Sequence, residues 1–179
     1  MLLPQRDDRV VPSGSGTMDN TLTRIVDFLV SIGIPTAACE LAGDTFLPAV
    51  CIQAGGLVYD PHRLRWPGDL LHEAGHIAVT PAELRAALND ALDDAAAAPE
   101  AGEVEAIAWS WAALVHLGLA PEVLFHAEGY KGRSEQLKLT YSLGVFPGVA
   151  GLARCGMTAS GPFAEPGVAR YPAMQRWLR

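Results

Sequence analysis

His72-Glu73-Ala74-Gly75-His76 is the motif around which the rest of the chain can be interpreted. It lies in the apolar segment 70–79, which follows Pro67-Gly68 and is expected to be a helix. Because residues i and i+4 share one face of a helix, both imidazoles can reach a single tetrahedral cation. Glu73 projects about 100° away from His72 and can take a proton from a water molecule that the metal has acidified. The spacing therefore predicts a catalytic Zn²⁺ site, with His72 and His76 as ligands and Glu73 as general base.

The residues before the motif predict one helix and one hairpin. Apolar residues recur at helical spacing from Met18 to Ile32, and Gly33 and Pro35 end the pattern. Residues 48–60 are β-prone on both sides of Gly55-Gly56, which indicates an antiparallel hairpin and is the only clear sheet material. We therefore expect an α+β fold in which a small antiparallel sheet packs on the motif helix.

Capping signals mark the helix starts around the motif. Asp69 is expected to cap the N-terminus of the motif helix. Thr80, Pro81 and Glu83 form a capping-box pattern at the start of a further helix. The apolar stripe expected on that helix consists of Leu84, Leu88, Leu92 and Ala95.

The last part of the chain is expected to be helical. Pro99 to Gly102 reads as a linker, and a strongly apolar helix follows from Glu103 to Leu117. Glycine and proline then divide the remainder, to Arg179, into short helices. The long apolar helix is expected to cross the motif helix.

A catalytic zinc site needs a third protein ligand, and a carboxylate is expected here. Residue 79 is valine and the next histidine after the motif is His116, so no histidine stands at the spacing of the extended HExxHxxGxxH motif. The available carboxylates are Glu83, Glu100, Glu103 and Glu105. Glu83 belongs to the capping box and Glu100 to the linker, which leaves the long helix.

Glu103 and Glu105 lie about 200° apart on that helix, so only one of them can face the motif. The face of Glu103 is the more completely apolar, and a carboxylate there needs a counter-charge such as zinc. Glu103 is therefore the preferred ligand and Glu105 the alternative. An acidic residue in the first helical turn is also favoured by the helix dipole, which accounts for Glu105.

The motif, followed 27 residues later by Glu103-Val104-Glu105-Ala106, resembles the gluzincin-type metallopeptidases. It is most like the small ImmA/IrrE-type group, whose second motif is an E-x-E-A-N-x-F-A helix. The resemblance covers residues of about 48–118. It implies that His72 and His76 bind zinc, that Glu73 is the general base, and that Glu103 is the glutamate ligand. A peptide or protein substrate is implied as well.

A hydrogen-bond donor is expected to stabilise the oxyanion of the tetrahedral intermediate. Tyr130 and His126 could supply it, because they lie in a glycine-flanked turn shortly after the ligand helix. Asp69 could instead orient a ligating imidazole from one turn before the motif. His62 is expected at the surface and His116 on a helix, with neither as a ligand. The tryptophans Trp66, Trp109, Trp111 and Trp177 are expected in the core or at contacts between elements.

Composition restricts the class of protein. The chain has 179 residues, half of them hydrophobic, and a net charge of −7. This length can bury a core without disulfides, so we expect one domain over residues 17–179 after a flexible leader, 1–16. An acidic chain without a basic run argues against nucleic-acid and membrane partners. Cys39, Cys51 and Cys155 form no CxxC pair and are expected as buried, reduced thiols, and no secretory signal is visible, so a cytoplasmic protein is expected.

Two further functions remain compatible with the motif. The same ligands could hold a structural metal in an inactive binding module, or the site could hydrolyse an amide other than a peptide bond. In the preferred interpretation, a zinc metallopeptidase, the metal polarises the scissile carbonyl while Glu73 accepts a proton and returns it to the leaving amine.

Overall fold

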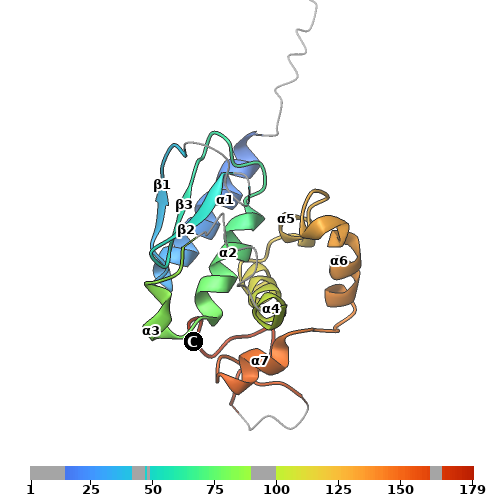
Figure 1. Cartoon of the computed structure of the whole chain (residues 1–179). Helices are drawn as coiled ribbons and strands as arrows, with labels where there is room; N and C mark the ends of the chain where they lie inside the picture. Colours follow the sequence, from blue (N-terminus) through green and yellow to red (C-terminus); the bar gives the residue numbers. More distant parts are fainter. Residues whose placement is uncertain (1–14, 42–46, 48, 90–99, 162–166) are drawn as a thin grey trace, which may run out of the picture.

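A computed structural model describes residues 15–41, 47, 49–89, 100–161 and 167–179. These residues form seven α-helices, one short 3₁₀ turn and a three-stranded sheet, which confirms the expected α+β class (Figure 1). In chain order the elements are α1 (Ser15–Ser31), β1 (Thr36–Ala38), β2 (Val50–Gln53), β3 (Gly56–Tyr59), α2 (Gly68–Val79), α3 (Ala82–Arg85), α4 (Glu100–His116), α5 (Pro121–Leu124), η1 (Tyr130–Gly132), α6 (Ser134–Ser142) and α7 (Val149–Arg154).

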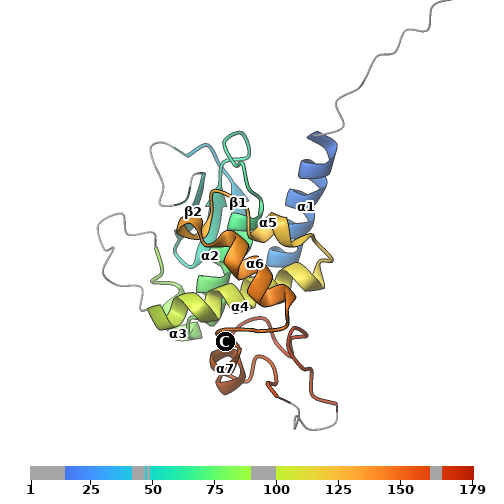
Figure 2. The same cartoon turned by 90° about the vertical axis from the view of Figure 1, so that its right-hand side faces the viewer.

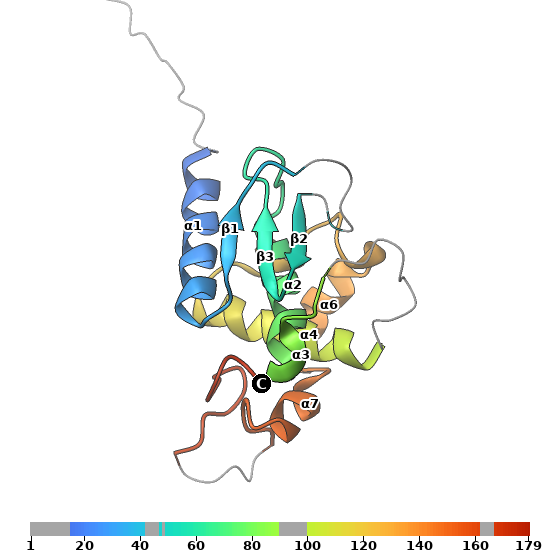
Figure 3. The ribbon, with the colours of Figure 1, turned by 60° about the vertical axis from the view of Figure 1, so that its left-hand side comes forward.

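The sheet is mixed and not purely antiparallel as expected. β2 and β3 form the antiparallel hairpin predicted by the sequence, with its turn at Ala54-Gly55, where both residues have positive φ. β1 pairs in parallel with the other side of β3, so the strand order is β1-β3-β2 (Figure 3). The Leu57 N–H also donates to the Pro35 carbonyl oxygen at 2.7 Å, which fixes the start of β1 against β3.

Helix α2 lies between the sheet and α4 (Figure 1). Its apolar side chains join those of α1, the sheet and α4 in one core, in which Trp109 and Trp111 of α4 are buried as expected. Trp66 and Trp177 are partly exposed and contact neighbouring rings. Helix α7 packs against α4 on the side away from the sheet (Figure 2). The motif helix is thus held from both sides.

Helices begin within two residues of both predicted starts, but neither Asp69 nor Thr80 caps a helix N-terminus as predicted. Asp69 lies inside α2, whose N-cap is Pro67, and its carboxylate pairs with His126. The Thr80 hydroxyl donates to the His76 carbonyl oxygen at 2.8 Å, so it closes the end of α2 instead of starting a new helix. Helix α3 consequently has a single turn without a side-chain cap. Of the stripe predicted for this helix, Leu92 and Ala95 lie outside the described residues.

Two predicted boundaries change by a few residues. Ser15 and Gly16, placed in the leader, form the first turn of α1, and the rest of the leader lies outside the described residues. Glu100, placed in the linker, is the first residue of α4. The helix that carries Glu103 therefore begins almost one turn earlier than expected.

The last residues connect the two central helices. The Arg179 N–H donates to the Ala78 carbonyl oxygen near the end of α2 at 3.0 Å. In α4, Trp109 Nε1 donates to the Trp177 carbonyl oxygen at 2.8 Å. The C-terminal segment 167–179 therefore contacts both helices that carry the motif and the expected third ligand.

The three cysteines are free, but they are not buried as predicted. Cys39 is exposed, next to the short edge strand β1, and Cys51 and Cys155 are partly exposed. Among the described helices, none combines the length and the apolar character that crossing a membrane requires.

Candidate metal centre

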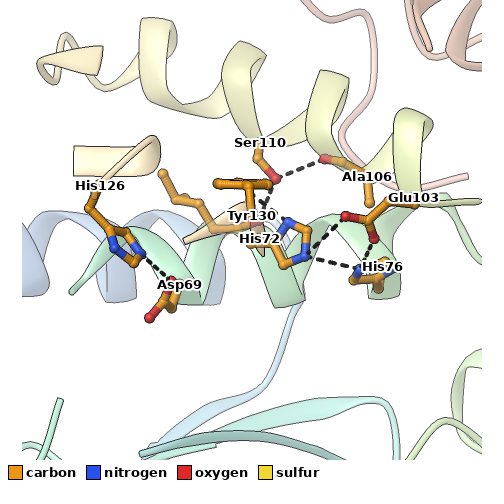
Figure 4. Close-up of polar contacts among 9 residues, drawn as sticks. Asp69, His72, His76, Glu103, Ala106, Ser110, His126 and Tyr130 are labelled. Atoms are coloured by element: carbon orange, nitrogen blue, oxygen red, sulfur yellow. Dashed lines mark hydrogen bonds and ion pairs between the residues drawn. The ribbon is translucent and has the colours of Figure 1, made fainter. Parts of the chain in front are cut away.

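Helices α2 and α4 bring together the three residues predicted as zinc ligands (Figure 4). His72 Nε2 and His76 Nε2 lie 3.3 Å apart on one face of α2. Glu103 approaches from α4, with Oε1 3.7 Å from His72 Nε2 and Oε2 3.2 Å from His76 Nε2. One ligand atom from each residue lies within 4.8 Å of the other two.

These separations fit a tetrahedral zinc ion. With Zn–N and Zn–O bonds of about 2.0–2.2 Å, the ligand atoms of a tetrahedral site lie roughly 3.3 Å from one another. The distance between the two imidazole nitrogens, 3.3 Å, equals that value, and each nitrogen has a different Glu103 oxygen near it, at 3.7 Å for His72 and 3.2 Å for His76. Two imidazole nitrogens and one carboxylate are also a ligand set that zinc commonly takes in catalytic sites.

The charge states of the three side chains suit a cation as well. Burial, reinforced by the neighbouring His76, lowers the pKa of His72 to about 4, so this imidazole is neutral near pH 7. The hydrogen bond with His76 is the largest cause of a lowered pKa at Glu103, and burial acts in the opposite direction. The cluster therefore offers a neutral imidazole and an ionised carboxylate, the forms that bind metal.

Helix α4 can approach the motif because Gly75 has no side chain. A Cβ atom at Gly75 would lie only 2.6 Å from the Ala106 carbonyl oxygen and 2.9 Å from Ser110 Oγ. The Ser110 hydroxyl lies 2.8 Å from the carbonyl oxygens of both Leu71 and Ala106, so it links the two helices at the same place. Helix α4 is therefore the element that approaches α2 most closely at Gly75.

Glu105, the alternative third ligand, points toward α7 and not toward the motif. Its side chain packs against Gly151, where a Cβ atom would overlap the Glu105 carboxylate. Glu105 Oε1 lies 3.8 Å from Arg154 Nη2. Glu83, also considered as a ligand, is exposed. The geometry therefore favours Glu103 for the third position.

Tyr130 lies beside His72, on the other side of the imidazole from Glu103. Its hydroxyl is 3.5 Å from His72 Nδ1, and the two rings meet edge to face with centroids 5.2 Å apart. The residue begins the turn η1, in which Tyr130 and Lys131 have left-handed φ angles of 54° and 52°. Burial raises the pKa of Tyr130, so the hydroxyl keeps its proton.

His126 does not join the three clustered side chains. It is buried, its Nε2 lies 2.9 Å from Asp69 Oδ1, and its ring stacks on Trp66 with centroids 4.6 Å apart. Figure 4 shows this pair displaced along α2 from the clustered ligands. Asp69 thus holds His126 and not a ligating imidazole. The role of His126 as an oxyanion donor stays a prediction. Its contacts with Asp69 and Trp66 attach the turn 126–130 to the start of α2.

The other predicted side chains occupy different places. Glu73 is buried in α2, and its charge contributes to the raised pKa of Tyr130. His62 is exposed, as expected. His116 lies at the end of α4 against the rings of Phe28 and Trp177, far along the helix from Glu103.

Sequence reasoning missed one charged residue near the cluster. Arg133 follows η1 directly, and its N–H donates to the Tyr130 carbonyl oxygen at 3.1 Å. Its positive charge is the smallest of the causes that lower the pKa of Glu103, after the hydrogen bond with His76 and the charges of both histidines. Arg133 stands only three residues after Tyr130, and this spacing could have drawn attention to it in the sequence.

Comparison of the chain with models of protein families, with curated proteins and with solved structures found no match. The resemblance to gluzincins therefore rests on the residues of the motif alone. Function has to be argued from the site itself.

Proposed function

We propose that the protein is a zinc-dependent hydrolase, and more specifically a metallopeptidase that acts on a cytoplasmic peptide or protein segment. The observation that carries this proposal is the cluster of His72, His76 and Glu103, whose ligand atoms lie within 4.8 Å of one another, with Glu73 directly after the first histidine. Three protein ligands leave the fourth zinc position for water or substrate, as catalytic sites require.

Each side chain of the site has a distinct part in this reaction. A bound zinc ion would supply Lewis-acid polarisation of the scissile carbonyl and lower the pKa of water. His72, His76 and Glu103 hold the ion, and two of them come from one rigid helix. Glu73 accepts the proton of the attacking water and returns it to the leaving amine.

Tyr130 orients His72 in this proposal. If Nε2 bound a metal, Nδ1 would carry the ring proton of His72. This N–H would then donate a hydrogen bond to the Tyr130 hydroxyl oxygen, which lies 3.5 Å away. The oxyanion role predicted from the sequence is an alternative to this one. A hydroxyl bonded to Nδ1 lies on the side of the imidazole away from Nε2, where the metal and the substrate carbonyl would be.

The variant Tyr130→Phe is expected to bind zinc about 10–100-fold more weakly, because His72 loses the partner of its Nδ1 proton. Competition with a chromogenic chelator measures this affinity, and the melting temperature of the zinc-free protein serves as control, since it should hardly change. Unchanged zinc affinity with a lower kcat would restrict Tyr130 to the oxyanion role and contradict the orienting one.

Metal content tests the proposed function directly. Purified protein, dialysed against a mild chelator, should retain one zinc ion per chain by elemental mass spectrometry, and His76→Ala and Glu103→Ala should lose it. Glu105→Ala is the matched control, because it removes a carboxylate from the same helix on the side facing α7. A wild type without zinc would contradict the proposal. Zinc loss in Glu105→Ala alone would identify Glu105, instead of Glu103, as the third ligand.

A further inference from the structure

The turn 126–130 contacts helix α2 at two places, and Figure 4 shows both. At the start of the turn, His126 Nε2 lies 2.9 Å from Asp69 Oδ1. At its end, the Tyr130 hydroxyl lies 3.5 Å from His72 Nδ1. Asp69 and His72 are three residues apart on α2, so they share one face of the helix. The contact that involves a metal ligand is therefore next to a contact that does not.

The contact between His126 and Asp69 is buried and has one arrangement of the proton. Only 4% of the His126 side chain and 11% of the Asp69 side chain are exposed, and the Trp66 ring stacks on His126 with an angle of 5° between the planes. His126 Nδ1 is buried without a hydrogen-bond partner among the described residues, so a proton there would be an unsatisfied donor. Nε2 therefore carries the proton and donates to the carboxylate, and such bonds are about twice as strong as those between neutral groups.

The end of the turn has a backbone conformation that needs support from its surroundings. Tyr130 and Lys131 have left-handed φ angles of 54° and 52°, which residues other than glycine adopt rarely and keep only where neighbouring contacts determine them. The turn also closes over the His126 ring: a Cβ atom at Gly129 would lie only 3.1 Å from Cε1 and Nε2 of that ring. The place of the ring therefore limits where the backbone enters Tyr130.

We infer that Asp69 and His126 are a positioning pair: by fixing the turn 126–130 on α2, they keep the Tyr130 hydroxyl at His72 and so raise the zinc affinity of the cluster. This inference rests on the proposed zinc-dependent function. It assigns His126 an effect on the metal that is exerted through Tyr130, as an alternative to the oxyanion role predicted for it. The small exposed fraction of the His126 side chain agrees with an indirect effect.

Zinc affinities of single and double variants, measured by competition with a chromogenic chelator, test the inference. His126→Phe keeps a ring on Trp66 but loses the bond to Asp69, and it should weaken zinc binding about three- to tenfold. His126→Gln, whose amide nitrogen can donate to the same carboxylate, should retain most of the affinity. In protein that already carries Tyr130→Phe, His126→Phe should cause no further loss, because the hydroxyl through which it acts is gone.

Asp69→Asn weakens the same bond in a side chain of nearly unchanged shape, so it provides the test if His126→Phe does not fold. Its effect on zinc affinity should be larger in the wild type than in Tyr130→Phe. Exchange of the His72 Nδ1 proton with water, followed by NMR of ¹⁵N-labelled zinc-loaded protein, is a second measurement. Exchange should be faster in His126→Phe and in Tyr130→Phe than in the wild type.

Tyr141→Phe is the matched control for a loss of stability alone. It removes a hydroxyl that donates to the Pro147 carbonyl oxygen at 2.8 Å, so it should lower the melting temperature but leave zinc affinity unchanged.

Unchanged zinc affinity in His126→Phe would overturn the inference, as would an equal effect of the His126 or Asp69 substitution with and without the Tyr130 hydroxyl. The hydrolase proposal would stand in either case. A wild type that binds no zinc would contradict the proposed function itself.

Discussion

Replacing Glu73 with glutamine is expected to lower kcat for peptide hydrolysis by about 10²–10⁴-fold while zinc binding is retained. Glutamine has nearly the shape of glutamate but cannot accept the proton of the attacking water. Incubation of the zinc-loaded wild type and variant with a peptide library of unbiased composition, followed by mass spectrometry of the products, measures the effect.

The matched control for this prediction is Glu105→Gln. Glu105 is another glutamate with little exposure, 18% for its side chain, and it lies on the α7 side of α4. Its replacement should leave the rate nearly unchanged. Cleavage by Glu73→Gln at the wild-type rate would show that another group acts as the base. Cleavage by neither protein, with zinc bound, would favour the inactive metal-binding module.

Replacing Gly75 with alanine is expected to reduce both stability and zinc affinity. The new methyl group would lie 2.6 Å from the Ala106 carbonyl oxygen, so α4 must move away from α2. Overpacking of this kind lowers the free energy of unfolding by about 1–3 kcal/mol. The higher helix propensity of alanine offsets about 1 kcal/mol of this loss. We expect a net loss of about 1 kcal/mol, which lowers the melting temperature of a chain of this size by roughly 2–4 °C. Calorimetric melting of the zinc-free protein measures the loss.

Gly102→Ala is the control for this substitution. Gly102 also lies in a helix, but a Cβ atom there would have no atom within 4 Å, so alanine should leave stability unchanged or raise it by up to about 1 kcal/mol. Because Glu103 moves with α4, Gly75→Ala should also weaken zinc binding relative to Gly102→Ala. Equal melting temperatures and zinc affinities for the two variants would contradict the close approach of the helices.

The fold class and the ligand cluster could be predicted because both depend on local periodicity. The i, i+4 spacing of His72 and His76 places their imidazoles together on any helix. Glu103 could be preferred over Glu105 because a helix has one face toward its neighbour, and the more apolar face was that of Glu103. Local rules were sufficient where the chain followed one regular element.

Features that depend on tertiary partners could not be predicted in the same way. Asp69 has the residue type of a helix cap, yet its carboxylate pairs with His126, 57 residues further along the chain. Strand β1 has three residues and no alternation of apolar and polar side chains, and it exists because β3 lies beside it. The place of Tyr130 depends on a left-handed turn that the sequence does not require.

The hydrogen bonds of Arg179 to α2 and of Trp109 to the Trp177 carbonyl group bear on how the ligand cluster fluctuates. Both helices that supply the ligands are attached to the same C-terminal segment, more than 60 residues beyond Glu103. Local opening of proteins occurs in cooperative units of this kind. Detachment of the segment would loosen α2 and α4 together, so the distance between the two histidines on α2 and Glu103 on α4 is coupled to an opening motion of residues 167–179.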